Sequence, residues 1–253
     1  MQMFAASQIF GIFHFPLFLS TVLLSAIILY FMGTAKSGKL HYIRSISGLK
    51  AIDEAVGRAT ELGKPVLFIS GLADVDNVQT LAALSILSHV ARKTAEYDTS
   101  LVMPNNYSVT MVMAQEVVRE AHLKVGRPDT FQPENIYYVS DAQFAFVGHV
   151  LGVIERSKPA ANIYMGRYFA ESLILAEAGF ATKAIQIAGT AETPQLPFFF
   201  TACDYCLIGE ELFAASAYLS KNPKQTGSIK AQDVIKVLIL AGIAVGAILA
   251  TLH

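Results

Sequence analysis

The chain has 253 residues, a formal net charge of −1 and a mean hydropathy of +0.46. A chain this close to neutral lacks the basic surface that nucleic-acid binding requires, so we expect no nucleic-acid partner. Its hydrophobic share of 53% is high for a soluble protein and fits two membrane spans around one globular domain. Two cysteines are too few for a disulfide framework.

The first apolar stretch covers residues 9–32 and contains five phenylalanines and a leucine–isoleucine run. No residue from Met1 to Ala35 is charged, and Pro16 either kinks this stretch or marks its start. A cleaved signal peptide carries a basic segment before its apolar core, and residues 1–8 have none. We therefore expect a retained transmembrane anchor over residues 1–33.

The second apolar stretch covers residues 234–252 and carries no charge after Lys236. At about 1.5 Å per residue, a helix of this length spans ~28 Å, close to the hydrocarbon thickness of a bilayer. Gly242, Gly246 and Ala250 recur every four residues, which favours close packing against another helix along that face. The sequence thus predicts a C-terminal transmembrane helix over residues 234–253, with the lipid bilayer as a partner.

Basic residues lie on the inner side of both apolar stretches, between them in the sequence. Because positive flanks stay in the cytoplasm, they predict a plasma-membrane (inner-membrane) protein with residues 34–233 cytoplasmic and both termini outside. The residues concerned are Lys36, Lys39, Arg44, Lys221, Lys224, Lys230 and Lys236.

Between the two spans, short apolar runs alternate with amphipathic stretches. An amphipathic helix over residues 46–62 precedes strands predicted at 65–70, 101–103, 135–139, 161–165 and 183–188, with 196–202 as a candidate sixth. Helices are predicted at residues 78–97, 108–125, 142–156, 168–178 and 206–219. Such alternation with short loops is typical of a Rossmann-like, doubly wound α/β domain whose sheet is mainly parallel.

Ligands of open α/β sheets bind beyond the carboxyl ends of the strands, where polar residues follow each predicted strand here. Turns and helix caps use the same residue types, so this pattern has a purely structural alternative. The candidate ligand-binding residues are Gly71, Asp74, Asn77, Asn105, Asn106, Asp141, Arg167, Gly189, Thr190 and Glu192.

Known motifs for cofactors and catalysis are missing. Neither G-x-G-x-x-G nor G-x-x-x-x-G-K-[ST] occurs after the first strand, and no G-x-S-x-G elbow is present. Cys203 and Cys206 form a C-x-x-C pair without further ligands, so we interpret them as small buried residues rather than a zinc or redox site. We expect no cofactor, no metal and no catalytic residue, and the sequence leans away from an enzyme.

Several segments of the middle region resemble a family of uncharacterised prokaryotic membrane-anchored proteins, a domain of unknown function. The segments are residues 91–98 (ARKTAEYD), 114–121 (AQEVVREA), 170–177 (AESLILAE), 185–190 (IQIAGT) and 204–212 (DYCLIGEEL). This family has no established activity, so the resemblance implies a dedicated domain and assigns no site residue.

Three functions fit these features, and one of them is an accessory subunit of a membrane complex with unrelated partners. The first is a membrane-tethered scaffold that self-associates into a homo-oligomer, through its glycine face or through the run Phe198–Phe200, of which a strand would expose one side. The alternative is a sensor or enzyme that binds a small polar metabolite at the sheet edge, with Arg167 holding an anion and Asp141 or Glu192 binding it or acting as acid or base.

Overall fold

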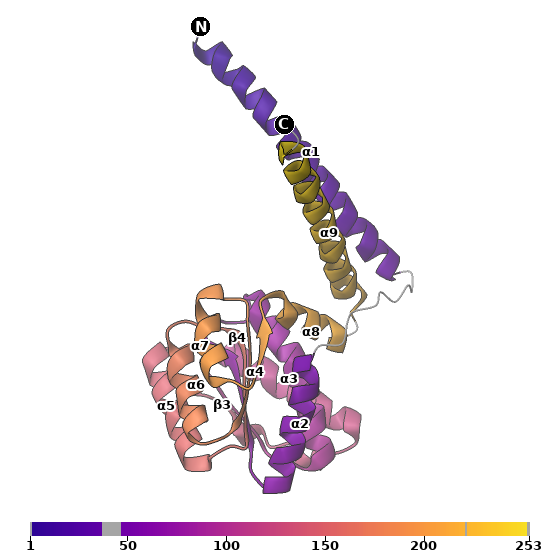
Figure 1. Ribbon diagram of the computed structural model, residues 1–253. Helices are drawn as coiled ribbons and strands as arrows, with labels where there is room; N and C mark the ends of the chain where they lie inside the picture. Colours follow the sequence, from indigo (N-terminus) through magenta and orange to yellow (C-terminus); the bar gives the residue numbers. More distant parts are fainter. Residues whose placement is uncertain (1, 37–46, 221, 252–253) are drawn as a thin grey trace. The chain divides into compact units, whose positions relative to one another are not determined.

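The computed structural model describes residues 2–36, 47–220 and 222–251 (Figure 1). The chain divides into two compact units. One comprises Met1–Arg44 together with Lys221–His253, and the other is Ser45–Ser220. Each unit is considered by itself.

The Ser45–Ser220 unit contains a six-stranded sheet in which every strand pair is parallel. This confirms the predicted α/β class and parallel sheet. The strand order is β3-β2-β1-β4-β5-β6, the order of the Rossmann fold. The strands are β1 (Val66–Gly71), β2 (Leu101–Asn105), β3 (Ile136–Tyr138), β4 (Ala161–Arg167), β5 (Ile185–Thr190) and β6 (Tyr205–Ile208).

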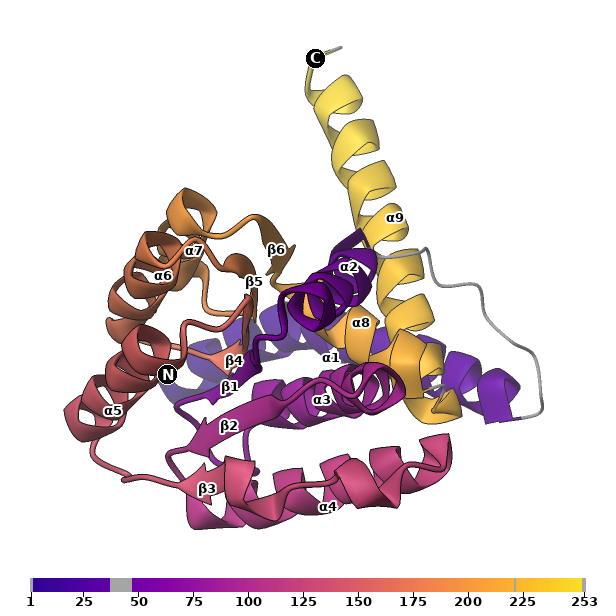
Figure 2. The same cartoon turned by 90° about the horizontal axis from the view of Figure 1, so that it is seen from below.

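Helices cover both faces of this sheet (Figure 2). One face packs against α2 (Ser47–Leu62), α3 (Val78–Tyr97), α4 (Ser108–Val125) and α8 (Glu210–Ser220). The other packs against α5 (Gln143–Ser157), α6 (Glu171–Ala181) and α7 (Leu196–Ala202). Short 3-10 turns span Pro128–Thr130, Pro133–Asn135 and Thr193–Gln195.

The side chains of successive residues in the central strands pack alternately into the two hydrophobic cores. Val66 and Phe68 of β1 belong to the larger core under α2, α3, α4 and α8, whereas Leu67 and Ile69 belong to the core under α5, α6 and α7. Because side chains alternate across a strand, a strand buried on both faces is apolar at most of its positions. This explains the uninterrupted apolar run that predicted β1.

Residues 196–202 form the helix α7, so the prediction of a strand there is wrong. Pro197 lies in the first turn, where a missing N–H costs nothing, and helical geometry turns Phe199 inward. The Phe199 ring lies 5.9 Å from that of Tyr164 and 5.1 Å from that of Tyr168, while Phe200 stays half exposed. The sixth strand is instead β6, within the segment predicted to begin the last helix, and Gly209 ends it at φ +56°.

The second strand continues through Pro104, where the sequence predicted a stop. β2 pairs with β1 only at Leu101 and Val102, and with β3 only from Met103 to Asn105. Pro104 therefore lies where the β1 side has already separated, and its missing N–H is tolerated there. The ends of α3 and α4 coincide with their predicted bounds.

The other unit holds two long helices, α1 (Gln2–Lys36) and α9 (Pro223–Thr251). Leu17–Ala35 and Pro223–Thr251 have the length and composition of membrane spans, criteria that a signal sequence can also meet. α9 begins at Pro223 rather than at the predicted residue 234, because proline is well placed in a first helical turn. α1 continues through Pro16 as one helix.

Gly227 marks a close approach of α1 and α9. A Cβ atom on Gly227 would lie 2.7 Å from the Phe31 carbonyl oxygen and 2.8 Å from the Met32 Cα atom. Ala231, one turn later, is fully buried. By contrast, a Cβ atom on Gly242 or Gly246 would meet no described atom within 4 Å. The face of Gly242, Gly246 and Ala250 is therefore open to a helix from another molecule.

Replacing Gly227 with leucine should separate α1 from α9, since backbone cannot yield as a flexible side chain can. Overpacking of this kind costs about 1–3 kcal/mol. Circular dichroism of the full chain in mild detergent, recorded as SDS is added, measures this loss. Gly242→Leu is the matched control because it points into open space. Equal destabilisation by the two variants would contradict the contact.

Candidate functional site

The strand order reverses between β1 and β4, where neighbouring crossovers leave toward opposite sides of the sheet. The loops beyond these carboxyl ends diverge, which makes this point the usual ligand position in open α/β sheets. The loops following β1, β4 and β5 meet there, and they carry most of the predicted site residues.

Two glycines let β1 and β4 approach closely at this edge. Gly71 has φ +80° and Gly166 has φ +129°. A Cβ atom on Gly71 would overlap the Arg167 carbonyl oxygen, and one on Gly166 would overlap that of Ser70. The Leu72 amide donates to the Arg167 carbonyl at 2.8 Å. The close approach of β1 and β4 therefore requires glycine at position 71, whether or not a ligand binds.

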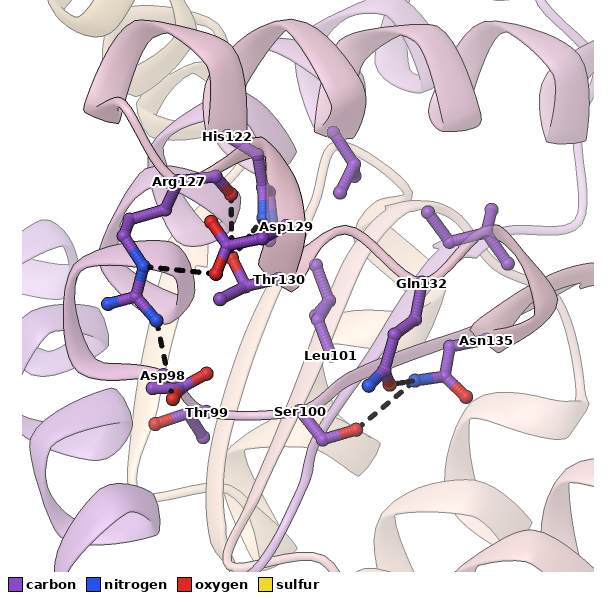
Figure 3. Close-up of a pocket in the computed structure, with 12 residues that line it drawn as sticks. Asp98, Thr99, Ser100, Leu101, His122, Arg127, Asp129, Thr130, Gln132 and Asn135 are labelled. Carbon is purple, nitrogen blue, oxygen red and sulfur yellow. Dashed lines mark hydrogen bonds and ion pairs between the residues drawn. The ribbon is translucent and has the colours of Figure 1, made fainter.

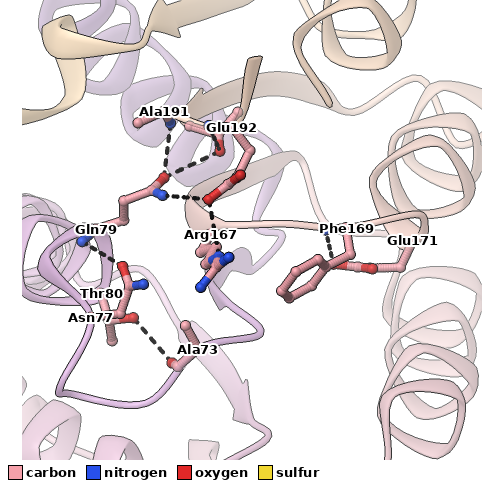
Figure 4. A network of polar contacts seen from close by, with 10 residues as sticks. Ala73, Asn77, Gln79, Thr80, Arg167, Phe169, Glu171, Ala191 and Glu192 are labelled. Carbon is pink, nitrogen blue, oxygen red and sulfur yellow. Dashed lines mark hydrogen bonds and ion pairs between the residues drawn. The ribbon is translucent and has the colours of Figure 1, made fainter. Parts of the chain in front are cut away.

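A polar network joins α3, β4 and the loop after β5 (Figure 4). Gln79 Nε2 donates to Glu192 Oε1 at 3.0 Å, and Gln79 Oε1 accepts from the Ala191 amide at 2.8 Å. The Thr190 hydroxyl donates to the same Gln79 oxygen at 3.3 Å. Arg167 Nε lies 3.0 Å from Glu192 Oε1 in an ion pair. The structure therefore brings Arg167, Thr190 and Glu192 together around one buried glutamine.

Arg167 is the cation of this site. Its side chain is 40% exposed, and its guanidinium carbon lies 5.0 Å from the centre of the Phe169 ring. Among the described residues, none forms a hydrogen bond or ion pair with its two terminal nitrogens. Glu192 on one side and the Phe169 ring on the other hold the guanidinium, which leaves its outer edge able to bind a carboxylate or phosphate.

Asp74 and Asn77 organise the loop between β1 and α3. Asp74 Oδ1 accepts from the Val75 amide at 2.8 Å and from the Thr110 hydroxyl at 3.0 Å, which ties this loop to α4. Asn77 caps α3 by accepting from the Gln79 amide at 2.9 Å. Asp74 is therefore a turn residue and Asn77 a helix cap. These are the structural roles that the sequence offered as the alternative to ligand binding.

Asn105 and Asn106 lie buried where β2 ends. Asn105 Nδ2 donates to the Met103 carbonyl at 2.9 Å, but its Oδ1 and both polar atoms of Asn106 have no partner among the described residues. Leaving such a group unpaired costs about 1–3 kcal/mol. α4 begins directly after them without a side-chain cap from Tyr107. This part of the carboxyl edge of the sheet, here called the rim, therefore has buried polar atoms without a partner among the described residues.

Two predicted site residues stand apart from the network. Asp141 is exposed, and its carboxylate has no hydrogen bond or ion pair within residues 47–220. Gly189 is buried, and a Cβ atom there would lie 2.6 Å from the Met165 sulfur, so its small size serves packing.

The sequence reading missed Gln79, Phe169 and Glu171. Glu171 is buried, accepts from the Phe169 amide at 2.8 Å and from Gln143 Nε2 at 2.6 Å, and thereby links the residues before α6 to α5. Gln79 could have been suspected from its place in the first turn of the helix after β1. Nothing in the sequence indicated that its partner lies 113 residues away.

The described residues contain no group of three or more His, Cys, Asp or Glu side chains that could hold a metal ion. The side chains described at this edge are one arginine, the acids Asp74, Asp141, Glu171 and Glu192, and several amides.

The profile of the family described as Domain of unknown function (DUF6754) matches residues 5–253, nearly the whole chain. The chain belongs to this family. The expected membership of an uncharacterised family is thereby confirmed. No curated protein and no solved structure is significantly similar to the chain.

The two cysteines of this DUF6754 chain are free and half buried. Cys203 follows the end of α7 and Cys206 lies within β6, so neither occupies the helix start typical of redox pairs. A hydrogen bond between the two sulfurs, together with burial, raises the pKa of Cys203, and the same bond lowers the pKa of Cys206. Both side chains pack at the margin of the core under α5, α6 and α7.

Proposed function

We propose that this DUF6754 protein binds a small polar ligand with one anionic group at the β1–β4 edge of a membrane-tethered α/β domain. The observation that carries the proposal is Arg167, which stands at the switch in strand order with its terminal nitrogens unused. Because the site has an acid but no nucleophile paired with a base, binding fits it better than catalysis.

The network around Gln79 would hold Arg167 ready for the ligand. Glu192 and Phe169 fix the guanidinium before any ligand arrives, so little side-chain entropy is lost on binding. The same network joins α3, the end of β4 and the loop after β5. A change in the position of Arg167 on ligand binding would therefore also shift α3 and the β5 loop. Asn105 Oδ1 and the amide of Asn106 would bind the uncharged polar part of the ligand if the β2–α4 loop shifted to admit it.

The change Arg167→Gln removes the positive charge and keeps a polar side chain, so it should weaken the binding of an anion. Loss of one charge-assisted contact corresponds to about a 10- to 100-fold weaker affinity. Thermal unfolding of the full chain in detergent, with citrate or inorganic phosphate titrated in, measures the effect. Arg119→Gln is the control, since Arg119 pairs with Glu116 on the exposed face of α4. If both variants respond to the anions as the unaltered chain does, Arg167 is not the anion site.

The tether is the second part of the proposal. The α1 segment Leu17–Ala35 and α9 expose large apolar side chains along their length, which suits lipid tails rather than water. The flanking lysines and Arg44 support a cytoplasmic α/β domain and outer termini.

Protease added to sealed, right-side-out cells should leave the α/β domain intact if this sidedness holds, and cleave it after the cells are opened. A chain carrying an epitope in the exposed turn after α4, detected by immunoblot, gives the measurement. Cleavage of the domain in sealed cells would reverse the proposed orientation.

Self-association as a scaffold is a second candidate function, favoured by the unequal charge of the two helical layers. α2 alone carries Lys50, Asp53, Glu54, Arg58 and Glu61, whereas the exposed charges of α5, α6 and α7 together are Glu155, Arg156 and Glu177. The same three helices expose Phe144, Leu173, Ile174, Phe180 and Phe200. An apolar, nearly uncharged face is complementary to its own copy, because no like charges meet across a twofold axis.

The change Phe180→Glu should therefore lower the mass of the detergent-solubilised protein, since it places a charge on a side chain that is 66% exposed on this face. Light scattering on a size-exclusion column measures the mass. Leu62→Glu on the charged layer, at 53% exposure, is the control and should leave the mass unchanged. A monomeric unaltered chain would remove the basis for this candidate.

A further inference from the structure

A second polar pocket lies at the opposite, amino edge of the sheet, where α3 and α4 end and β2 and β3 begin (Figure 3). Its volume is about 340 Å³, at the lower end of the ~300–1,000 Å³ typical of small-molecule sites. Asp98, Ser100, His122, Arg127, Asp129 and Asn135 are among the residues that line it. None of these belongs to the rim site around Arg167.

The hydrogen bonds of Thr130 determine which nitrogen of His122 carries the proton. The Thr130 hydroxyl donates to the Arg127 carbonyl at 2.8 Å, so its oxygen must accept from His122 Nδ1, also at 2.8 Å. Nδ1 is therefore protonated, and in the neutral ring Nε2 is left as an acceptor. Burial lowers the pKa of His122, which keeps the ring neutral near pH 7.

The charges around the pocket leave it negative. Arg127 lies between two acids, with Nη2 3.4 Å from Asp98 Oδ2 and Nε 3.7 Å from Asp129 Oδ2. Two carboxylates against one guanidinium and a neutral histidine make a formal charge of −1. The carboxyl ends of α3 and α4, which carry partial negative charge, point to the same place.

The uncharged lining groups also offer acceptors. Asn135 Nδ2 already donates to Gln132 Oε1 at 2.7 Å and to Ser100 Oγ at 3.2 Å, which leaves Asn135 Oδ1 without a partner among the described residues. His122 Nε2 and the outer oxygens of Asp98 and Asp129 are further acceptors that no described residue uses. A ligand that satisfies them brings several N–H groups and a positive charge.

We propose that this pocket binds a small organic cation, an amine or guanidinium compound, at the oxygens of Asp98 and Asp129 that face away from Arg127. An organic cation fits better than a metal ion because the residues described at the pocket include no cluster of three metal-ligating side chains. The site is separate from the anion site proposed at Arg167, so each can fail without the other.

Isothermal titration of the full chain in detergent with agmatine and with putrescine tests the proposal, and 1,4-butanediol serves as the uncharged analogue. We expect saturable binding of at least one amine and none of the diol. The double variant Asp98→Asn with Asp129→Asn should weaken amine binding about tenfold or more. Asparagine tolerates the left-handed conformation of Asp98 (φ 56°), so the fold should persist.

Glu116→Gln, an equally exposed acid on α4 outside the pocket, is the matched control and should bind the amines unchanged. Absence of saturable binding by both amines would overturn the proposal. So would equal affinity of the double variant and the control, because generic attraction of cations to surface acids would then explain the signal.

Discussion

The close pairing of β1 with β4 is the constraint on which the α/β unit depends. These strands run in register from Val66 opposite Ala161 to Ile69 opposite Tyr164, and the register shifts before Gly71. Only glycine at positions 71 and 166 lets the two backbones meet there, and the Tyr168 hydroxyl secures the junction by donating to the Ile69 carbonyl at 2.8 Å. Burial raises the pKa of Tyr168 well above its usual range, so the hydroxyl remains a donor. Arg167, between Gly166 and Tyr168, is thereby placed at the switch in strand order.

The polar groups at this edge divide into those that stabilise the fold and those that remain available. Asn77 caps α3, and Asp74 ties its loop to α4. Glu171 accepts from the amide of Phe169, just before α6. Both the nitrogen and the oxygen of the Gln79 amide form hydrogen bonds with the loop after β5. By contrast, the terminal nitrogens of Arg167, Asn105 Oδ1 and both polar atoms of Asn106 have no partner among the described residues. Availability of this kind is what separates a binding group from a structural one.

The helix termini give the two edges of the sheet opposite partial charges for a general reason. All strands are parallel, so the helices that connect them begin at one edge and end at the other. Helix starts favour anions and helix ends favour cations. Arg167 adds to this polarity at the carboxyl edge, and Asp98 and Asp129 add to it at the amino edge. The two proposed sites follow this division.

The sequence by itself determined the elements that depend on local patterns. The buried run of β1, the bounds of α3 and α4, and the alternation that makes the sheet parallel were all readable, because hydrophobic period and caps act within a few residues. The strand-end residues of the rim followed from that alternation. The run containing Phe198–Phe200 was misread, since three phenylalanines are apolar in a helix and a strand alike, and only contact with Tyr164 and Tyr168 decides between them.

Tertiary structure alone decided which rim residues meet. Strand order sets whether Arg167, Glu192 and Gln79 share a site, and order depends on how whole layers pack rather than on any local signal. The amino-edge pocket was not predicted for the same reason, since Asp98 follows α3, His122 lies in the last turn of α4 and Asn135 precedes β3. Local sequence determines which polar side chains lie at the ends of the strands and helices. Long-range packing determines which of these side chains lie within hydrogen-bonding distance of one another.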